Sequence, residues 1–111
     1  MQIFRVIVRG RFGPLDPAQR EGLVATAADH DLVSSGATFT AGGTLAYDGR
    51  IDFFSYRIEV RIGDDDADGP AAAREVAFER ATAVAAADLE RRGLTWRHLE
   101  PTGTNMADVW N

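Results

Sequence analysis

Two stretches of the chain determine the fold, residues 4–12 (FRVIVRGRF) and residues 52–62 (DFFSYRIEVRI). In both, apolar side chains alternate with side chains that are mostly polar or charged. A period of two is typical of β-strands, because successive side chains leave a strand on opposite faces. In the first stretch the arginines oppose Phe4, Val6 and Val8, and in the second the polar residues oppose a row of aromatic and aliphatic ones. The two stretches therefore predict a sheet with one core face and one face that carries arginine.

The chain outside these strands predicts two helices. Asp16, Pro17 and Gln19 are typical of a helix start, because aspartate can cap free amide groups, proline suits the first helical position and glutamine can reach back as in a capping box. We expect this helix over residues 16–31. A second helix is expected from Pro70 onward, since its apolar residues recur at spacings of three and four. Those residues are Ala77, Phe78, Ala81, Val84, Ala85 and Leu89.

The order of the elements predicts the fold class. Between the helices the period of two returns, with strands expected at residues 37–40, 44–47 and 52–62, and a last strand is expected at residues 95–102. Strand, helix, hairpin, helix, strand is the split βαβ order called ferredoxin-like, in which both helices cover one face of an antiparallel sheet. We therefore predict a single α+β domain of this type, a ferredoxin-like sandwich, over residues 1–111, with the two arginine-bearing strands side by side.

Several motifs resemble a known family. They are RGRF at residues 9–12, GTLAYD at residues 43–48, DFF at residues 52–54 and TNMADVW at residues 104–110. In these motifs and in its length the chain is similar to a family of uncharacterised actinobacterial proteins catalogued as a domain of unknown function. The resemblance covers essentially the whole chain, and it implies family membership without implying an activity.

Composition places the chain among globular proteins. It has 111 residues, of which 45% are hydrophobic and 26% charged, so one domain with its own core is expected. The absence of cysteine excludes disulfides, thiolate zinc sites and cysteine nucleophiles. A formal net charge of −5 argues against nucleic-acid binding, because affinity for phosphate backbones comes largely from cationic contacts. No apolar stretch has the length of a signal peptide or a membrane span, and we expect cytoplasmic residence without membrane contact.

The sheet face opposite the core is the first candidate for function. Isoleucines and Phe53 add apolar area to it, which a fully solvated face rarely needs. The candidate ligand-binding residues on this face are Arg5, Arg9, Arg57, Arg61, Phe53 and Glu59. Three interpretations are open: a solvated face with weak salt bridges, a face covered by the same face of a second copy, or a dimer that encloses an arginine-lined pocket. In such a pocket arginine would bind a carboxylate or phosphate through forked hydrogen bonds.

These observations predict a homodimer that binds a small anionic or oxygen-rich molecule. If chemistry occurs there, His98 on the last strand is the candidate catalytic residue, since an imidazole can both take up and release a proton. An isomerase, cyclase or cofactor-independent oxygenase is then the expected kind of enzyme, by analogy of fold alone, and no cofactor is expected. The alternative is a non-catalytic interaction or assembly module whose arginine-bearing face packs on a partner.

A second alternative is calcium binding by the acidic loop that precedes the second helix. Asp64, Asp66, Asp68 and Gly69, followed by Glu75, resemble the loops of EF-hand proteins, in which alternate carboxylates converge on one ion and a later glutamate completes its shell. The element before the loop is a strand, however, and the helix after it begins early. A solvated loop in which Asp68 caps the second helix explains the same residues.

The C-terminal residues 106–110 end with two large apolar side chains. Burying such side chains adds to the small core of a domain of this size. We therefore expect this tail to dock over an edge of the helix and sheet, although a partner-binding peptide is an alternative.

Overall fold

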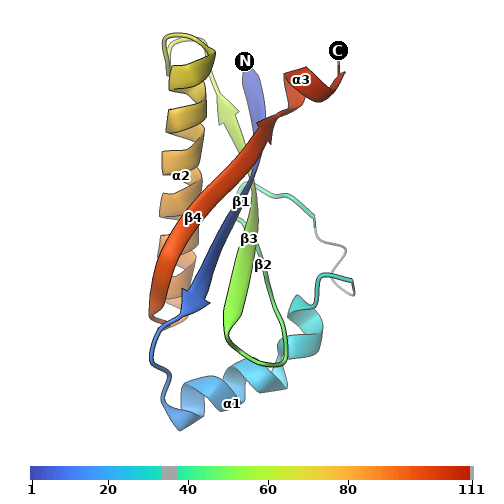
Figure 1. The fold of residues 1–111 in the computed structure, drawn as a ribbon, viewed down its shortest axis with the longest axis vertical. Coiled ribbons are helices and arrows are strands. Elements are labelled where there is room, and N and C mark those ends of the chain that lie inside the picture. The colour runs from blue at the N-terminus through green and yellow to red at the C-terminus, as the bar shows by residue number, and fades with distance from the viewer. Residues whose placement is uncertain (34–37, 111) are drawn as a thin grey trace.

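The structure, a computed structural model, describes residues 1–33 and 38–110. Its regular elements follow the chain in this order: β1 (Gln2–Phe12), α1 (Pro17–Ala25), the 3₁₀ helix η1 (Ala27–His30), β2 (Thr44–Tyr47), β3 (Phe53–Ile62), α2 (Pro70–Arg91), β4 (Trp96–Asn105) and α3 (Met106–Trp110). The four strands form one antiparallel sheet in the order β2-β3-β1-β4 (Figure 1). The predicted α+β class with an antiparallel sheet is therefore confirmed. Among the described helices, none is both long and apolar enough to cross a membrane.

β1 and β3 lie side by side along nearly their whole lengths. Their antiparallel register runs from Gln2 opposite Ile62 to Arg11 opposite Phe53. A ladder of this length pairs most of the backbone N–H and C=O groups that face each other across the two strands. The two arginine-bearing strands are thus neighbours, as the sequence predicts.

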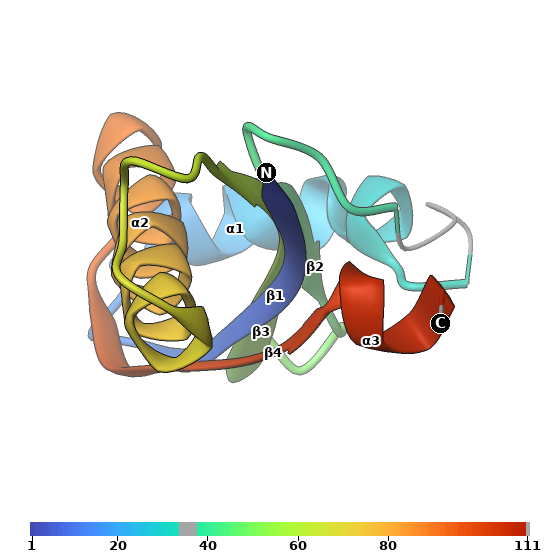
Figure 2. The same cartoon turned by 90° about the horizontal axis from the view of Figure 1, so that it is seen from above.

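α2 covers one face of the sheet and closes the core (Figures 1 and 2). Its buried apolar positions are Ala73, Ala77, Ala81, Ala85 and Leu89. Small side chains along one stripe let the helix approach the sheet closely, and larger side chains from the sheet fill the space between them. The largest fully buried side chains of the sheet are Tyr56, Phe4, Ile58, Ile62, Val6 and Val8. Burial of a large apolar side chain of this kind contributes roughly 1.5–3 kcal/mol to stability.

A charged network ties α2 to β3. The hydroxyl of Tyr56 donates to Asp88 Oδ2 at 2.6 Å, Arg92 Nε donates to the same oxygen at 2.7 Å, and Arg91 pairs with Oδ1. Burial opposes ionisation of Asp88, but the hydrogen bonds from Tyr56 and Arg92 outweigh it and hold its pKa below the usual value. Burial and the hydrogen bond to Asp88 raise the pKa of Tyr56. At neutral pH the phenol is therefore protonated and the carboxylate ionised.

The first turns of α1 and α2 are as predicted from the sequence, except for the residue that caps α2. Asp16 and Gln19 form the predicted capping box: the Gln19 amide donates to Asp16 Oδ1 at 2.7 Å, and the Asp16 amide donates to Gln19 Oε1 at 2.8 Å. α2 begins at Pro70, also as predicted. Its N-cap, however, is Gly69, without a hydrogen bond from a capping side chain, so the expected cap by Asp68 is wrong.

The first helix differs from the prediction in both length and place. α1 ends at Ala25, because the chain turns into η1 after Thr26, whose hydroxyl donates to the Gly22 carbonyl at 3.1 Å. Leu23 is the buried residue of α1, whereas Val24 is 55% exposed. A stripe with so little apolar area does not cover a sheet face. α1 instead lies across one end of the sheet (Figure 1), so the ferredoxin-like placement of two helices on one face is not found.

Two further segments also differ from the sequence prediction. Of the strand expected at residues 37–40, Ala37 lies outside the described residues, and Thr40 makes an isolated parallel bridge with Ile58. The C-terminal tail forms α3, which packs on β1 and β4 with Met106 buried. The tail therefore docks as expected, but it does so on the side of the sheet opposite α2, where η1 also lies (Figure 2).

We predict that Tyr56→Phe lowers the free energy of unfolding by about 1.5–3 kcal/mol at pH 7, because it removes a hydrogen bond to a buried carboxylate. The lowered pKa of Asp88 stabilises the fold above the unfolded value of about 4, and this contribution is lost as the pH falls through the lower, folded value. The difference in the free energy of unfolding between the wild type and the variant should therefore become smaller below about pH 4. Urea unfolding at a series of pH values measures it.

Tyr47→Phe is the matched control. The hydroxyl of Tyr47 donates to the backbone carbonyl of Leu23 at 2.7 Å, and no carboxylate takes part in that bond. Its loss should lower stability by an amount that stays constant over the same acid range. The same pH dependence in both variants would contradict the role assigned to Asp88.

Candidate functional site

The side chains of β1 and β3 that point away from α2 form one surface, which we call the arginine face. Alternation along the strands puts them there, because the residues between them are buried under α2. The face comprises Ile3, Arg5, Ile7, Arg9 and Arg11 of β1 and Phe53, Ser55, Arg57, Glu59 and Arg61 of β3. Arg9 lies opposite Ser55, and Arg57 lies opposite Ile7. The arginines of the two strands therefore interleave across the ladder.

Arg11 and Arg61 have carboxylate partners. Arg11 Nη2 lies 2.9 Å from Asp52 Oδ1, and its guanidinium is 4.9 Å from the centre of the Phe53 ring. Arg61 Nη2 lies 3.8 Å from Glu59 Oε2. Exposed pairs of this kind contribute at most about 1 kcal/mol, but each one offsets the local charge of its arginine.

Arg5, Arg9 and Arg57 have only neutral partners within the described part of the chain. Arg9 Nη1 donates to Thr102 Oγ1 at 3.3 Å, and Arg57 Nη1 donates to Ser55 Oγ at 3.4 Å. The guanidinium of Arg5 lies against an aromatic ring. None of these three arginines therefore has a salt bridge among the described residues, although Glu59 lies opposite Arg5 and Glu100 lies opposite Arg9 in the strand register.

Part of the arginine face is covered by other parts of the chain. The ring of Phe39 lies 5.6 Å from the guanidinium of Arg5 and 5.9 Å from that of Arg57, both cation–π arrangements. Met106 and Val109 of α3 line the same cleft as Arg5, with a volume of about 410 Å³. The sequence indicated Phe39 only as part of an expected strand, so its place over the arginines was missed.

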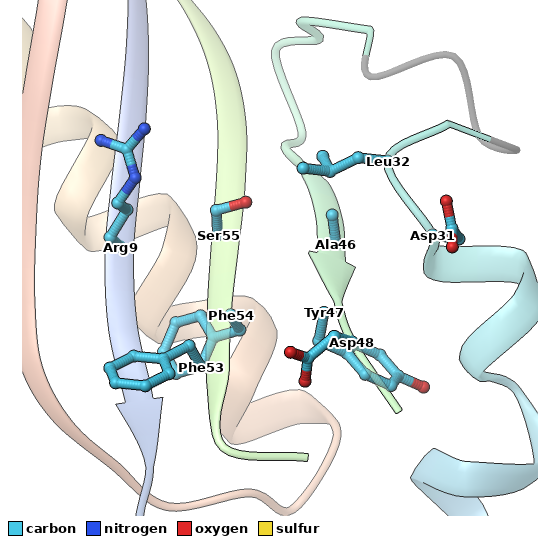
Figure 3. Close-up of a pocket in the computed structure, with 9 residues that line it drawn as sticks. All are labelled: Arg9, Asp31, Leu32, Ala46, Tyr47, Asp48, Phe53, Phe54 and Ser55. Carbon is cyan, nitrogen blue, oxygen red and sulfur yellow. The ribbon is translucent and has the colours of Figure 1, made fainter. Parts of the chain in front are cut away.

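Beside this covered part, the arginine face contains a second cleft of about 340 Å³, which we call the Arg9 cleft (Figure 3). It lies between the ends of β1, β3 and β2 and the residues that follow η1. Its lining residues are Arg9, Asp31, Leu32, Ala46, Tyr47, Asp48, Phe53, Phe54 and Ser55. Phe53 and Leu32, which are 58% and 43% exposed, provide apolar walls, and Arg9 and Ser55 provide hydrogen-bond donors. Apolar walls with a few polar groups are typical of small-molecule sites.

His98 lines an adjoining cleft of about 410 Å³ that shares Arg9 and Phe53 with the Arg9 cleft. The register between β1 and β4 shifts between Arg9 and Arg11, and His98 falls at this bulge with φ of 56°. Left-handed backbone is unfavourable for a residue with a Cβ, so the surrounding ladder must hold it in place. The bulge places the side chain of His98 on the arginine face, beside Arg9 and Phe53. The alternation of residues in β4 does not by itself tell on which face of the sheet His98 lies.

The structure brings together part of the predicted site. Four of the predicted residues line the clefts of this face, namely Arg5, Arg9, Phe53 and His98. Arg57 lines none of the three clefts, but it donates a hydrogen bond to Ser55, which lines the Arg9 cleft. Arg61 and Glu59 pair with each other and line none of the three clefts. Leu32 was missed because nothing in a loop sequence tells which face the loop will cover, whereas the polar alternation of β3 could have indicated Ser55.

The acidic loop does not assemble the expected calcium ligands. Asp64 pairs with the N-terminal amino group at 3.1 Å. Asp66 accepts a hydrogen bond from the backbone amide of Gly63, and its Oδ1 lies 3.3 Å from Arg80 Nη2. The Gly63 amide and the Arg80 guanidinium hold the pKa of Asp66 below its usual value. Glu75 is exposed on α2. Within residues 1–33 and 38–110, no three histidine or carboxylate side chains are grouped so that they could hold a metal ion.

Comparison with known proteins places the chain in a family. Residues 1–110 match a family of unknown function, DUF6204, and the chain belongs to that family. The match agrees with the resemblance seen in the sequence, both in length and in lacking an assigned activity. No curated protein and no solved structure matches the chain. Inference about function therefore rests on the geometry of the arginine face.

We predict that His98→Val destabilises the fold by about 1–2 kcal/mol, because a β-branched residue is strained in the left-handed region. His98→Asn should change stability by less than about 0.5 kcal/mol, since asparagine tolerates this backbone conformation. Urea unfolding of both variants measures the difference. Equal destabilisation by valine and asparagine would show that the contacts of the imidazole, and not the backbone, set the stability of the bulge.

Proposed function

We propose that this protein binds a small anionic molecule on the arginine face. The observation that carries the proposal is the cluster of Arg5, Arg9 and Arg57, none of which forms a salt bridge with a carboxylate in the part of the chain that the structure describes. Arg9 lines a cleft with apolar walls, and Arg57 donates a hydrogen bond to Ser55, which lines the same cleft. An anion with some apolar surface would match both features.

The chemistry of the guanidinium group supports an anion as the ligand. Glu59 and Glu100 lie opposite Arg5 and Arg9, but no salt bridge joins these pairs in the described part of the chain, so guanidinium donors stay available to a ligand. Each guanidinium presents N–H donors in a planar fork that fits carboxylate or phosphate oxygens. In a protein of net charge −5, a positive surface of this kind also draws anions to one place.

A second copy of the chain is the proposed cover for this face. Phe53, Leu32 and Val109 are large apolar side chains that stay exposed around the clefts. A two-fold dimer would bury all three on both copies at once, because the same surface meets itself across the axis. The competing proposal is an assembly module, in which the arginines contact a protein partner and no small molecule binds.

His98 is the side chain that would exchange a proton with a bound molecule. It lines the cleft beside Arg9, and an imidazole can donate and accept protons. The order strand, helix, hairpin, helix, strand supports a ferredoxin-like relationship in which α1 is displaced to the end of the sheet. Isomerase, cyclase or oxygenase chemistry rests on that analogy alone, so binding is the function proposed.

Isothermal titration with small carboxylates and phosphates tests the binding proposal. Arg9→Gln and Arg57→Gln should each weaken binding by at least about tenfold, since a hydrogen bond to a charged group contributes about 1.5–3 kcal/mol. Arg61→Gln is the matched control and should bind like the wild type, because Arg61 pairs with Glu59, which lines none of the clefts, whereas Arg57 donates to the lining residue Ser55. Absence of binding by both kinds of anion, or equal loss in the control, would contradict the proposal.

Light scattering of the protein as it elutes from a gel-filtration column measures its mass and tests whether two copies associate. We predict twice the mass of one chain for the wild type, and dissociation in Phe53→Glu, because the new carboxylate would be buried at the interface. Val24→Glu is the control, since Val24 is equally exposed but lines none of the described clefts. A monomeric wild type would remove the dimer from the proposal. Loss of association in Arg9→Gln, together with no anion binding, would favour the assembly module.

A further inference from the structure

We infer that the ligand of the Arg9 cleft is a monocarboxylic acid with one flat, apolar ring and a hydrogen-bond donor at the far end of that ring. This inference rests on the proposed function and narrows it to one class of anion. Three features of the cleft carry it: the groups at its cationic end, the surfaces of its walls, and the charge at its opposite end.

The cationic end fits a carboxylate better than a phosphate. Arg9 lies opposite Ser55 on the neighbouring strand, and Ser55 Oγ accepts a hydrogen bond from Arg57 at 3.4 Å. Phosphate sites commonly use backbone N–H groups at a helix N-terminus or in a loop nest. Here β1 and β3 pair with each other, and β1 also pairs with β4, so backbone amides at this place are already bonded in the ladders. The planar fork of the Arg9 guanidinium and the hydroxyl of Ser55, which Arg57 holds in place, match the two oxygens of a carboxylate.

The walls of the cleft fit a flat, apolar body. Phe53 presents its ring, still 58% exposed although Arg11 lies against it, and Leu32 stands across the cleft beside Ala46 (Figure 3). A ring between Phe53 and Leu32 would cover both apolar side chains. The volume of about 340 Å³ is near the lower end of the roughly 300–1,000 Å³ usual for ligand sites, so a single ring suits it better than a nucleotide.

Asp48 sets the chemistry at the opposite end. In Figure 3 its carboxylate lies beside Phe53 and Tyr47, near the lower end of the cleft, whereas the guanidinium of Arg9 lies near the upper end. Asp48 Oδ1 accepts a hydrogen bond from the backbone amide of Arg50 at 3.1 Å. The carboxylate of Asp48 has further lone pairs that can accept a hydrogen bond from a ligand. A second anionic group on the ligand would meet this charge and be repelled, whereas a hydroxyl or amino group would donate to it. The cleft should therefore reject dicarboxylic acids.

Titration of the full-length protein with five probes tests the inference: acetate, benzoate, para-hydroxybenzoate, terephthalate and phenyl phosphate. Benzoate should bind at least about tenfold more tightly than acetate, para-hydroxybenzoate more tightly than benzoate, and terephthalate and phenyl phosphate more weakly. Phe53→Ala should remove the preference for benzoate over acetate. Asp48→Asn should raise the affinity for terephthalate and lower that for para-hydroxybenzoate.

The outcomes separate this inference from the proposed function. If acetate and benzoate bind equally, or if phenyl phosphate binds best, the ligand class is wrong while anion binding stands. If none of the five probes binds, both are wrong. Arg61→Gln serves as the control that should keep the wild-type order of affinities, and thermal melting with light scattering shows whether each variant is folded and associated as the wild type is.

Discussion

The antiparallel pairing of β1 with β3 is the constraint on which the rest of the structure depends. It fixes the register from Gln2 to Arg11, and with it the side of the sheet to which every residue of the two strands belongs. A slip by one residue would place arginines under α2 and Tyr56 in water. The network of Tyr56, Asp88 and Arg92 locks this register to the helix, because the phenol reaches the carboxylate only from the core side.

The two faces of the sheet are built on different principles. On one, a stripe of alanines brings α2 close enough for a dense apolar core, and at Gly103 of β4 even an added Cβ would come within 2.8 Å of a backbone oxygen of Arg5. On the other, short segments from distant parts of the chain cover only part of the strands. Arg9 and Phe53 stay accessible between them, so the paired strands form the floor of the clefts.

The sequence predicted the features that depend on local periodicity. The alternation in β1 and β3 correctly assigned Arg5, Arg9 and Phe53 to the face away from the core, because a strand has only two sides. It did not predict the place of α1, which depends on how much apolar area the helix offers to the sheet, or the approach of Phe39 and Leu32 to the arginines, which depends on the path of a loop. The orientation of His98 was also hidden, since a bulge breaks the alternation on which the reasoning relied.

The edges of the sheet limit how copies of this chain can join. β2, at one edge, is four residues long, and η1 packs on it. β4, at the other, is distorted at His98 and contains Pro101, which has no backbone N–H to offer. Neither of these described edges presents a long, regular row of free backbone groups, the template that strand-by-strand polymerisation requires. Growth into open-ended fibrils by addition of strands at the sheet edges is thereby disfavoured.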